Sequence, residues 1–253
     1  MKLLSFSLSG RFAAFRDPSV TSNQTAYYVP SKSAVIGLLG AMIGIQRNNS
    51  SLGSAYGRNY VGLFSKTSVG IRYESEPRKI TYFTNHRSLE NANMKPFKKE
   101  LLENPRYRIF VLIDNSSTMF RDLEFSIKEN RFIYSPYLGH AYCPAVISDA
   151  QTHSVNEVMD SKDEITDCVI LDESETYSPD FKLTILPAAD NKKKPSVMIE
   201  RHLHHFHVDN SLDSRVLKYW IPVNFSLYRI DRDGKRRLSR FYKIDGAKIV
   251  CMF

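Results

Sequence analysis

Residues 28–45 have the sequence YVPSKSAVIGLLGAMIGI, and this stretch decides how the first part of the chain folds. Pro30 disfavours the helical conformation at Val29, so the residues before it are expected to be extended. Ser31 can accept a hydrogen bond from one of the free N–H groups at a helix start. The stretch therefore predicts a helix that begins at about Ser31 and is entered from an extended segment.

This helix has two different faces when its residues are placed at about 100° intervals. Three glycines inside one helix cost roughly 0.8–1 kcal/mol each relative to alanine. That cost is understandable if another backbone or a sugar-phosphate chain must approach closely, or if the helix packs tightly against a sheet, and both interpretations stay open. The small face carries Ser33, Gly37, Gly40, Ala41 and Gly44, and the apolar face carries Val35, Leu39, Met42 and Ile43.

The start of the helix suits an anion. Ser31, Lys32 and Ser33 lie where free N–H groups and the positive end of the helix dipole face outward. A lysine there opposes the dipole unless a phosphate is its partner. No G-x-x-x-x-G-K-[ST] motif occurs here, so a nucleotide triphosphate loop is not supported. The sequence predicts that an anion such as a phosphate group binds at this helix end.

Composition places the chain among ordinary globular proteins, since 253 residues with 42% hydrophobic and 25% charged residues can bury a sizeable core. The apolar run from Ala34 to Ile45 has 12 residues and is too short to cross a bilayer, so no membrane partner is expected. Cys143, Cys168 and Cys251 are three and far apart, which favours neither a disulfide framework nor a zinc ribbon. We therefore predict a cytoplasmic protein.

Charge is unevenly distributed along the chain. The net charge is +8, yet residues 157–180 contain nine acidic residues and one basic residue, so the rest of the chain carries +16. A basic body with a separate acidic segment indicates a polyanion partner for the body. The alternative for the acidic segment is a solvated loop.

The first 150 residues predict an alternation of strands and helices. Leu4, Phe6 and Leu8 alternate with serines, as in a half-buried strand. Met119, Leu123 and Ile127 recur at four-residue spacing and predict a second helix. Strand, helix, strand, strand, helix, strand is the ferredoxin-like order shared by RNA-recognition folds. The strands expected besides the first lie at 60–64 together with 67–73, at 106–113 and at 131–134.

An insertion at about residues 74–105 separates the two central strands. Cations bind phosphates and aromatic rings stack on unstacked bases, so this composition suits single-stranded nucleic acid. A solvated hairpin with ordinary surface lysines is the alternative. The insertion carries Arg78, Lys79, His86, Arg87, Lys95, Lys98 and Lys99, interleaved with Tyr82, Phe83 and Phe97.

The rest of the chain is expected to be rich in strands. The predicted organisation is an α+β protein with an RNA-recognition-like domain at residues 1–150 and a β-rich subdomain at 151–253. The strands predicted in the second part lie at 181–186, 197–208, 220–230 and 248–253.

Two motifs resemble a known family, and a third segment fits it. Residues 28–47 form the first motif, Ser135-Pro-Tyr-Leu-Gly-His-Ala-Tyr-Cys-Pro144 forms the second, and Gly10-Arg-Phe-Ala-Ala-Phe-Arg-Asp-Pro18 fits the opening loop. Together they resemble the Cas-five family of the RAMP superfamily, a subunit of the type I CRISPR surveillance complex called Cascade. The resemblance covers roughly residues 1–150 and favours subtype I-B.

The resemblance implies a ferredoxin-like core with a protruding β-hairpin thumb, here the insertion. It further implies a non-catalytic subunit that binds the 5′ handle of the CRISPR RNA and caps the backbone filament. The backbone subunit and the large subunit are then partners, and target DNA lies nearby. The candidate RNA-binding residues are Arg11, Arg16, Tyr28, Ser31, Lys32, Ser33, Arg78, His86, Arg87, Lys95, Lys98, Tyr137, Leu138, Gly139 and His140.

Catalysis is the runner-up expectation. In one subtype, similar proteins cut precursor RNA without metal, using a tyrosine together with an adjacent lysine and histidine. Tyr27 and Tyr28 lie near the corresponding place, but the sequence has no Lys-His or His-Lys pair. His86 is the nearest candidate for acid–base work. We therefore expect no catalytic residues, with a metal-independent endoribonuclease as the alternative.

The segment Arg201-His-Leu-His-His-Phe-His207 raises the question of a metal. In a strand, His202 and His204 would face one side and His205 and His207 the other, so at most two could share an ion. No carboxylate or cysteine lies at conventional ligand spacing. We therefore expect neither a metal nor a cofactor. A further alternative is an RNA-binding module that works outside any complex, which neighbouring genes would exclude.

Overall fold

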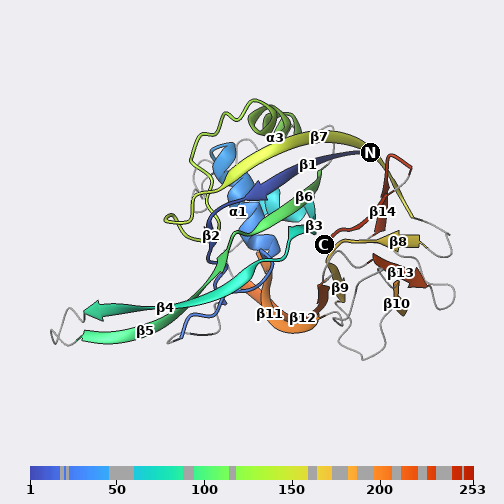
Figure 1. The fold of residues 1–253 in the computed structure, drawn as a ribbon. Coiled ribbons are helices and arrows are strands. Elements are labelled where there is room, and N and C mark those ends of the chain that lie inside the picture. Colours follow the sequence, from blue (N-terminus) through green and yellow to red (C-terminus); the bar gives the residue numbers. More distant parts are fainter. Residues whose placement is uncertain are drawn as a thin grey trace.

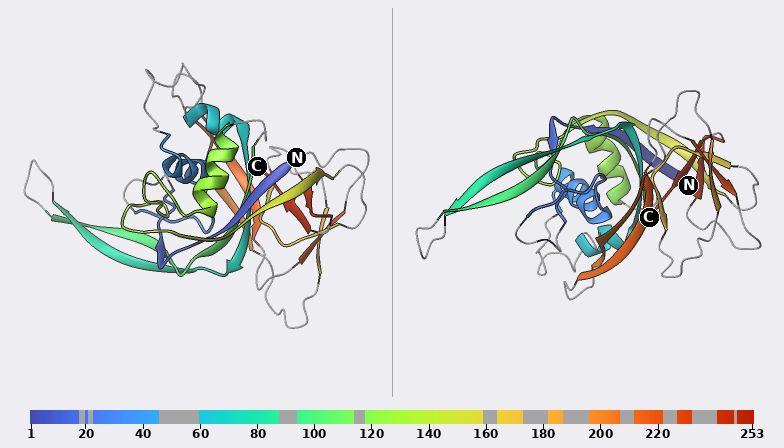
Figure 2. Two further views of the ribbon diagram at one scale, coloured as in Figure 1. Left: turned by 90° about the horizontal axis from the view of Figure 1, so that it is seen from above. Right: turned by 60° about the horizontal axis from the view of Figure 1, so that its bottom comes forward.

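The computed structural model describes residues 1–17, 20, 23–45, 60–87, 94–113, 118–158, 164–172, 182–186, 196–206, 212–221, 227–231, 241–246 and 248–253. Its centre is a six-stranded sheet with all neighbours antiparallel. Helices α1 (Lys32–Met42), α2 (Tyr60–Lys66) and α3 (Thr118–Lys128) lie over one face of this sheet (Figures 1 and 2). The strand order is β15 (Lys248–Cys251), β14 (Phe241–Ile244), β7 (Val146–Glu157), β1 (Lys2–Ser9), β6 (Arg106–Ile113) and β3 (Thr67–Ser75).

The free edge of β3 is covered by later parts of the chain. Phe253 and Val69 exchange two backbone hydrogen bonds of 2.8 Å, and Val169 N–H donates to the carbonyl of Ile71 at 2.8 Å. Segments from the C-terminal part therefore close the sheet that the N-terminal part begins. Because β7 also continues through residue 150, the central sheet draws on both sides of the predicted boundary. The division at residue 150 stays a prediction.

Strand β1 is buried on both faces, so the prediction of a half-buried strand was wrong. Ser5 and Ser7 are only 1% and 2% exposed. Ser7 Oγ donates to both carboxylate oxygens of Glu74 at 2.8 Å, and Ser5 Oγ lies 2.9 Å from Nε2 of His153. These hydrogen-bond partners satisfy the two hydroxyl groups, so their burial costs little free energy. The alternating serines therefore belong to a second buried layer, on the face of β1 opposite Leu4, Phe6 and Leu8.

Helix α1 begins as predicted. Ser31 is extended, with φ −66° and ψ 159°, and its side chain accepts from the N–H of Ala34 at 3.2 Å. Val35, Leu39 and Met42 are 1%, 0% and 0% exposed and belong to the main core. The apolar face is confirmed as the face that packs on the sheet.

Two predicted strand segments are not strands. Tyr60, Leu63 and Phe64 recur at helical spacing and bury one face of α2, which overrides the strand preference of their aromatic rings. Ile133 and Tyr134 donate their N–H groups to the carbonyls of Met42 and Ala41 at 3.0 and 3.1 Å. These bonds satisfy the last carbonyls of α1, so residues 131–134 cap the end of that helix and do not join a sheet. The strand that follows α3 is β7.

The insertion forms a long hairpin that projects from the body (Figures 1 and 2). Strands β4 (Arg78–Arg87) and β5 (Met94–Glu103) pair antiparallel through ten residue pairs without a register shift. Near its base, β5 also pairs with β2 (Phe12–Ala13). The N–H of Gln24 donates to the Lys98 carbonyl at 3.0 Å, and the N–H of Glu100 donates to the Gln24 carbonyl at 2.9 Å. The lower half of the hairpin is thus braced, and the tip extends beyond that brace.

The C-terminal part is rich in strands, as predicted. It contains two three-stranded sheets, in the orders β10-β13-β8 and β11-β12-β9. The single strand predicted at 220–230 is wrong, because two strands occupy its ends. The bounds are β8 (Glu164–Thr166), β9 (Ile170–Asp172), β10 (Lys182–Leu186), β11 (Ser196–Phe206), β12 (Leu212–Ile221) and β13 (Leu227–Asp231).

Candidate nucleic-acid interface

A cleft of about 510 Å³ opens along the small face of α1. Three tyrosines, Tyr60, Tyr134 and Tyr137, contribute to its walls. None of the described lining residues carries a charge, so the cleft suits a flat, uncharged group such as a nucleobase better than a phosphate. Its lining consists of Ser33, Ala34, Gly37, Leu38, Ala41, Ile45, Tyr60, Tyr134, Tyr137 and Gly139.

The glycines of α1 serve two different purposes. A Cβ added at Gly37 would meet nothing within 4 Å, so this residue opens onto the cleft. A Cβ at Gly40 would lie 3.5 Å from the carbonyl oxygen of Ile45 and 3.7 Å from Leu63. Packing therefore accounts for Gly40, although against Ile45 and against Leu63 of α2 and not against the sheet, while close approach of another chain at Gly37 stays a prediction.

The side chains at the helix start contact other groups of the protein, and phosphate binding there stays a prediction. Ser31 Oγ caps the helix and lies 2.9 Å from Ser33 Oγ. The ammonium group of Lys32 lies 5.0 Å from the ring centroid of Phe64, within cation–π range. All three residues are half-buried, and Ser33 is the one that lines the cleft. The structure thus brings Ser33 to the site and directs Lys32 toward an aromatic ring.

The second motif forms a tight loop that packs against residues 14 and 15. Gly139 has φ +85°, and an added Cβ would overlap the carbonyl oxygen of Ala14. The N–H of Ala14 donates to the Leu138 carbonyl at 2.9 Å. Leu138 is 1% exposed and belongs to the core, so its side chain serves packing, and RNA binding by this residue stays a prediction. Glycine is required at 139 because two backbone segments touch there.

His140 joins this loop to the hairpin. Its ring stacks on Tyr142 with centroids 4.9 Å apart, and the Tyr142 hydroxyl lies 3.1 Å from that of Tyr82 on β4. Burial lowers the pKa of His140, and the nearby charges of Lys99 and Arg16 lower it further. Burial and the Tyr82 hydroxyl raise the pKa of Tyr142. A neutral imidazole, two phenols and two cations therefore lie in one neighbourhood.

Tyr28 lies where α1 is entered and meets the base of the hairpin. The ammonium group of Lys79 lies 4.3 Å from the Tyr28 ring centroid and 3.3 Å from a carboxylate oxygen of Glu100. The hydroxyls of Tyr73 and Tyr107 donate to the Tyr28 carbonyl at 3.2 and 2.6 Å. Tyr28 is therefore fixed by the body and contacts the hairpin through Lys79.

The hairpin has two faces, because side chains alternate along a strand and opposite residues share a face. We call the face of Thr81, Phe83, Asn85 and Arg87, opposite Glu100, Lys98, Pro96 and Met94, the open face. Phe83 is 69% exposed there, and Lys98 lies directly opposite it. We call the face of Ile80, Tyr82 and Thr84, opposite Leu101, Lys99 and Phe97, the body face, and these six side chains are half-buried or buried.

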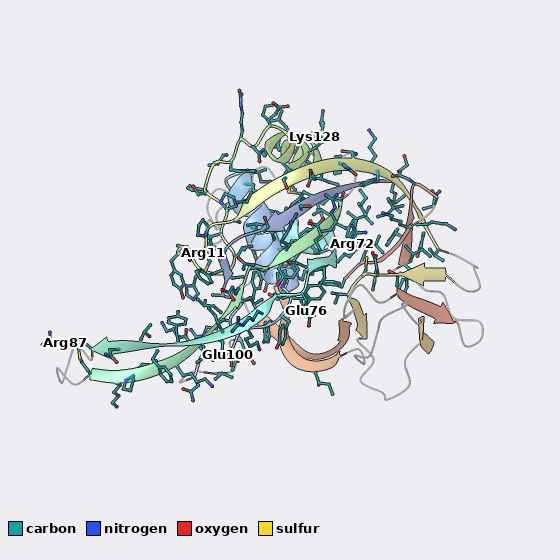
Figure 3. All side chains as sticks on the ribbon, in the orientation of Figure 1. Arg11, Arg72, Glu76, Arg87, Glu100 and Lys128 are labelled. Carbon is teal, nitrogen blue, oxygen red and sulfur yellow. The ribbon has the colours of Figure 1, made fainter. Side chains whose placement is uncertain are left out.

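The predicted cations are spread along this arm. Arg87 and Lys98 belong to the open face, and Arg87 lies at the far tip, well away from Arg11 (Figure 3). Lys95 is exposed and pairs with His86 in the ladder, while the exposed Arg78 lies at the base, 3.9 Å from Glu103. They do not gather at one point, and their order along the arm suits an extended polyanion.

The two arginines of the opening loop are both exposed. The Arg11 guanidinium lies 5.4 Å from the Phe12 ring centroid, where β2 joins the hairpin base. Arg16 donates to the carbonyl of Val20 at 3.3 Å and contributes to the field at His140. Arg16 is thus near the motif loop, and Arg11 lies at the foot of the arm.

Sequence reasoning left several site residues out of the candidate set. Tyr60 was assigned to a strand, and Tyr134 likewise, so their places on the cleft wall were not anticipated. Tyr82 and Lys99 were recognised in the basic insertion but not as neighbours of His140. The presence of Tyr142 inside the second motif was the available signal for its role.

Other expectations concern metals and membranes. Among the described residues, no group of three or more His, Cys, Asp or Glu side chains is arranged to hold a metal ion. In β11, the register shifts between Leu203 and His205, so the strict alternation assumed for the histidines is interrupted there. His207 lies outside the described residues. No described helix is long and apolar enough to cross a membrane.

The fold and the site define a mixed α/β protein, mostly of antiparallel sheets, that combines an uncharged aromatic cleft with a cationic arm. The family described as "CRISPR-associated protein (Cas_Cas5)" matches residues 3–225. The chain belongs to this family, which is the one that the motifs resembled. The match extends well beyond the 150 residues on which the resemblance rested.

Solved structures of CRISPR proteins are similar to this chain at low sequence identity, and the first of them shares its fold. A CRISPR protein from Archaeoglobus fulgidus is 14% identical to this chain and has a TM-score of 0.56. The match covers 99% of this chain and 98% of the A. fulgidus chain. A chain of a CRISPR RNA-guided surveillance complex is 12% identical to this chain and has a TM-score of 0.46. That match covers 87% of this chain and 92% of the other. No curated protein matches the chain.

Proposed function

We propose that this protein is a non-catalytic RNA-binding subunit of a type I CRISPR effector complex. In this proposal it binds the 5′ handle of the CRISPR RNA and caps the backbone filament beside the large subunit, near the target DNA. One observation carries the proposal: an uncharged, tyrosine-walled cleft lies next to a cationic arm, joined to it by the motif loop. Family membership and the fold of the A. fulgidus protein support it.

The chemistry of the two parts fits different parts of an RNA strand. Unstacked bases gain from aromatic walls and bare backbone, which the cleft supplies at Tyr137 and Gly37. Phosphates gain from the exposed cations Arg16, Lys98 and Arg87. A strand that places one base in the cleft and runs its backbone along the arm would use both.

The same proposal includes a ferredoxin-like core. The order β7-β1-β6-β3 with α1 and α3 on one face agrees with the split βαβ arrangement of that fold. The opposite face offers no RNA platform of the usual kind, because Ser5 and Ser7 occupy the central strand and Phe110 is 5% exposed. RNA binding is therefore assigned to the cleft and the arm.

The test is direct RNA binding by the purified chain. We expect repeat-derived RNA containing the handle to bind, and Tyr137→Ala combined with Arg87→Ala to weaken binding by about 10- to 100-fold, since both kinds of contact are lost. Fluorescence anisotropy in EDTA measures this. Equal affinity of the double variant and the parent would refute the assignment of the site.

A second function is favoured by one observation, the neighbourhood of His140. A neutral imidazole beside Tyr142 and Lys99 has the parts for metal-independent RNA cleavage by the ribose 2′-OH. Incubation of the protein with labelled precursor RNA in EDTA distinguishes the two functions. Specific cutting within the repeat that His140→Ala abolishes would establish the nuclease. We expect intact RNA.

A further inference from the structure

Strand β4 has an unoccupied side. It is the outermost strand of the sheet β2-β5-β4, and none of the described residues pairs with its outer edge. In an antiparallel strand with a single neighbour, the N–H and C=O groups of every second residue point away from that neighbour. The arm thus presents a row of backbone donors and acceptors along its length.

The middle of this edge, at residues 80–85, lacks the devices that usually block strand pairing. Proteins protect edges with proline, bulges, short strands or charges. The β4–β5 ladder runs through ten pairs without a shift, whereas the β1–β7 and β3–β6 ladders each contain one. Residues 80–85, Ile-Thr-Tyr-Phe-Thr-Asn, contain neither proline nor charge and favour a strand. The middle of the edge is therefore regular and open to pairing.

The chemistry of the edge selects a protein as its partner. An RNA backbone offers phosphate acceptors to the outward N–H groups but leaves the outward carbonyls poorly matched, whereas a peptide strand satisfies both. A second copy of this chain paired antiparallel would bring Arg78 of one copy close to Arg87 of the other at both ends. Like charges opposite each other are destabilising, so a partner with acidic residues at both ends fits better.

We propose that the outer edge of β4 binds an extended segment of a different protein subunit by β-strand addition. Acidic residues at the two ends of that segment meet Arg78, whose side chain is 80% exposed, and the exposed Arg87. Backbone hydrogen bonds to residues 80–85 supply the affinity. The open and body faces stay available to RNA, since the five N–H donors of Arg87 allow it to contact a carboxylate of the segment and a phosphate together. This inference rests on the chain working in an assembly, but not on where RNA binds.

Hydrogen exchange at single-residue resolution tests the proposal. Amide exchange of β4 is compared in the chain alone, in the chain with repeat-derived RNA, and in the complex reconstituted with the other subunits encoded beside it. We expect every second amide of residues 80–85 to slow at least about tenfold in the complex alone. Unchanged exchange in the complex overturns the proposal. If RNA alone slows the exchange of the β4 amides, the edge binds nucleic acid and the proposal is wrong. If exchange in the free chain slows as the protein concentration rises, the edge binds a second copy of the chain and the proposal is also wrong.

A pair of variants separates strand addition from RNA binding. Thr81 is exposed, and a lysine there adds an edge charge, which disfavours strand pairing. We expect Thr81→Lys to enter the complex about tenfold more weakly, with undiminished RNA affinity, while Thr81→Gln behaves as the parent. Equal incorporation of Thr81→Lys overturns the proposal. If the parent chain assembles but binds no RNA, the proposed function fails, and the exchange result still decides the strand addition.

Discussion

The cleft on the body and the arm that projects from it offer an RNA strand opposite kinds of contact. The cleft is concave and uncharged, and its shape comes from Gly37 and the rings of three tyrosines. The arm projects from the body and is cationic, and its contacts are single exposed side chains such as Lys98 and Arg87. Shape selects a particular group at a short range, whereas charge attracts any phosphate and weakens with salt. The comparison therefore predicts that the cleft selects which base binds, and that most of the salt-dependent part of the RNA affinity comes from the arm.

The largest effect is expected at the junction of the two regions. Gly139→Ala should lower the free energy of unfolding by at least about 3 kcal/mol, because a left-handed residue is replaced and the new Cβ would overlap the Ala14 carbonyl. Gly246→Ala is the matched control, since Gly246 has φ +75° with nothing within 4 Å, and it should cost about 1 kcal/mol. Urea unfolding measures both. Similar losses in the two variants would mean that the close approach at Gly139 has been overestimated.

The arm is tested by its salt dependence. Arg87→Ala with Lys98→Ala should weaken RNA binding about tenfold and reduce the slope of log affinity against log salt by about 1.4, from two lost phosphate contacts. Tyr137→Phe, a change in the cleft wall, should leave this slope unchanged. Anisotropy titrations at several salt concentrations measure the slope. An identical slope in the arm variant would contradict the division of labour between cleft and arm.

The cleft is tested by filling it. Gly37→Ala should raise the free energy of unfolding by about 0.8 kcal/mol, since alanine favours a helix and the added methyl group meets no atom within 4 Å. The same methyl group narrows the cleft, so RNA affinity should fall while stability rises. Gly40→Ala adds a methyl group that faces Ile45 and Leu63 and serves as the control with no effect on the cleft. Higher affinity of Gly37→Ala would exclude close approach of RNA at this residue.

The smallest effect is a pH dependence at His140. Its pKa is lowered in the folded protein by burial and by Lys99 and Arg16, so the unfolded chain binds the proton more readily. Stability from this group is complete above the ordinary value of 6.5 and decreases as the pH falls below it. His140→Gln should make the unfolding free energy less dependent on pH in that range, and thermal unfolding between pH 5 and 8 shows this. RNA phosphates bound beside Lys99 and Arg16 would offset the charges that lower the pKa of His140, so RNA should weaken the pH dependence of the parent protein.

Much of the body could be predicted because its signals are local. The cap at Ser31, the apolar face with Leu39, and the spacing of Met119, Leu123 and Ile127 each need only neighbouring residues to take effect. The basic insertion likewise formed the hairpin where its composition placed it. The family motifs identified the family because they combine these local requirements, as at Gly139.

The failures came from distant partners. Ser5 and Ser7 follow a half-buried pattern, yet His153 and Glu74 allow them to be buried. Residues 131–134 favour a strand locally, but their N–H groups bond to the end of α1. The place of Tyr60 on the cleft wall depends on a hydrogen bond to the carbonyl of Ser33, across 27 residues. Such contacts leave no periodic trace in the sequence.

The brace at the base of the hairpin has a mechanical consequence. Ten residues of strand span roughly 33 Å, and the clamp at Gln24 and β2 holds the lower part. The arm therefore behaves as a cantilever, in which a load at the tip produces its largest bending moment close to the Tyr82–Tyr142 contact. A force applied to Arg87 by a partner or a nucleic acid would be transmitted to the loop that carries His140 and Gly139. The tip of the arm is in this way mechanically linked to Gly139, where two backbone segments touch.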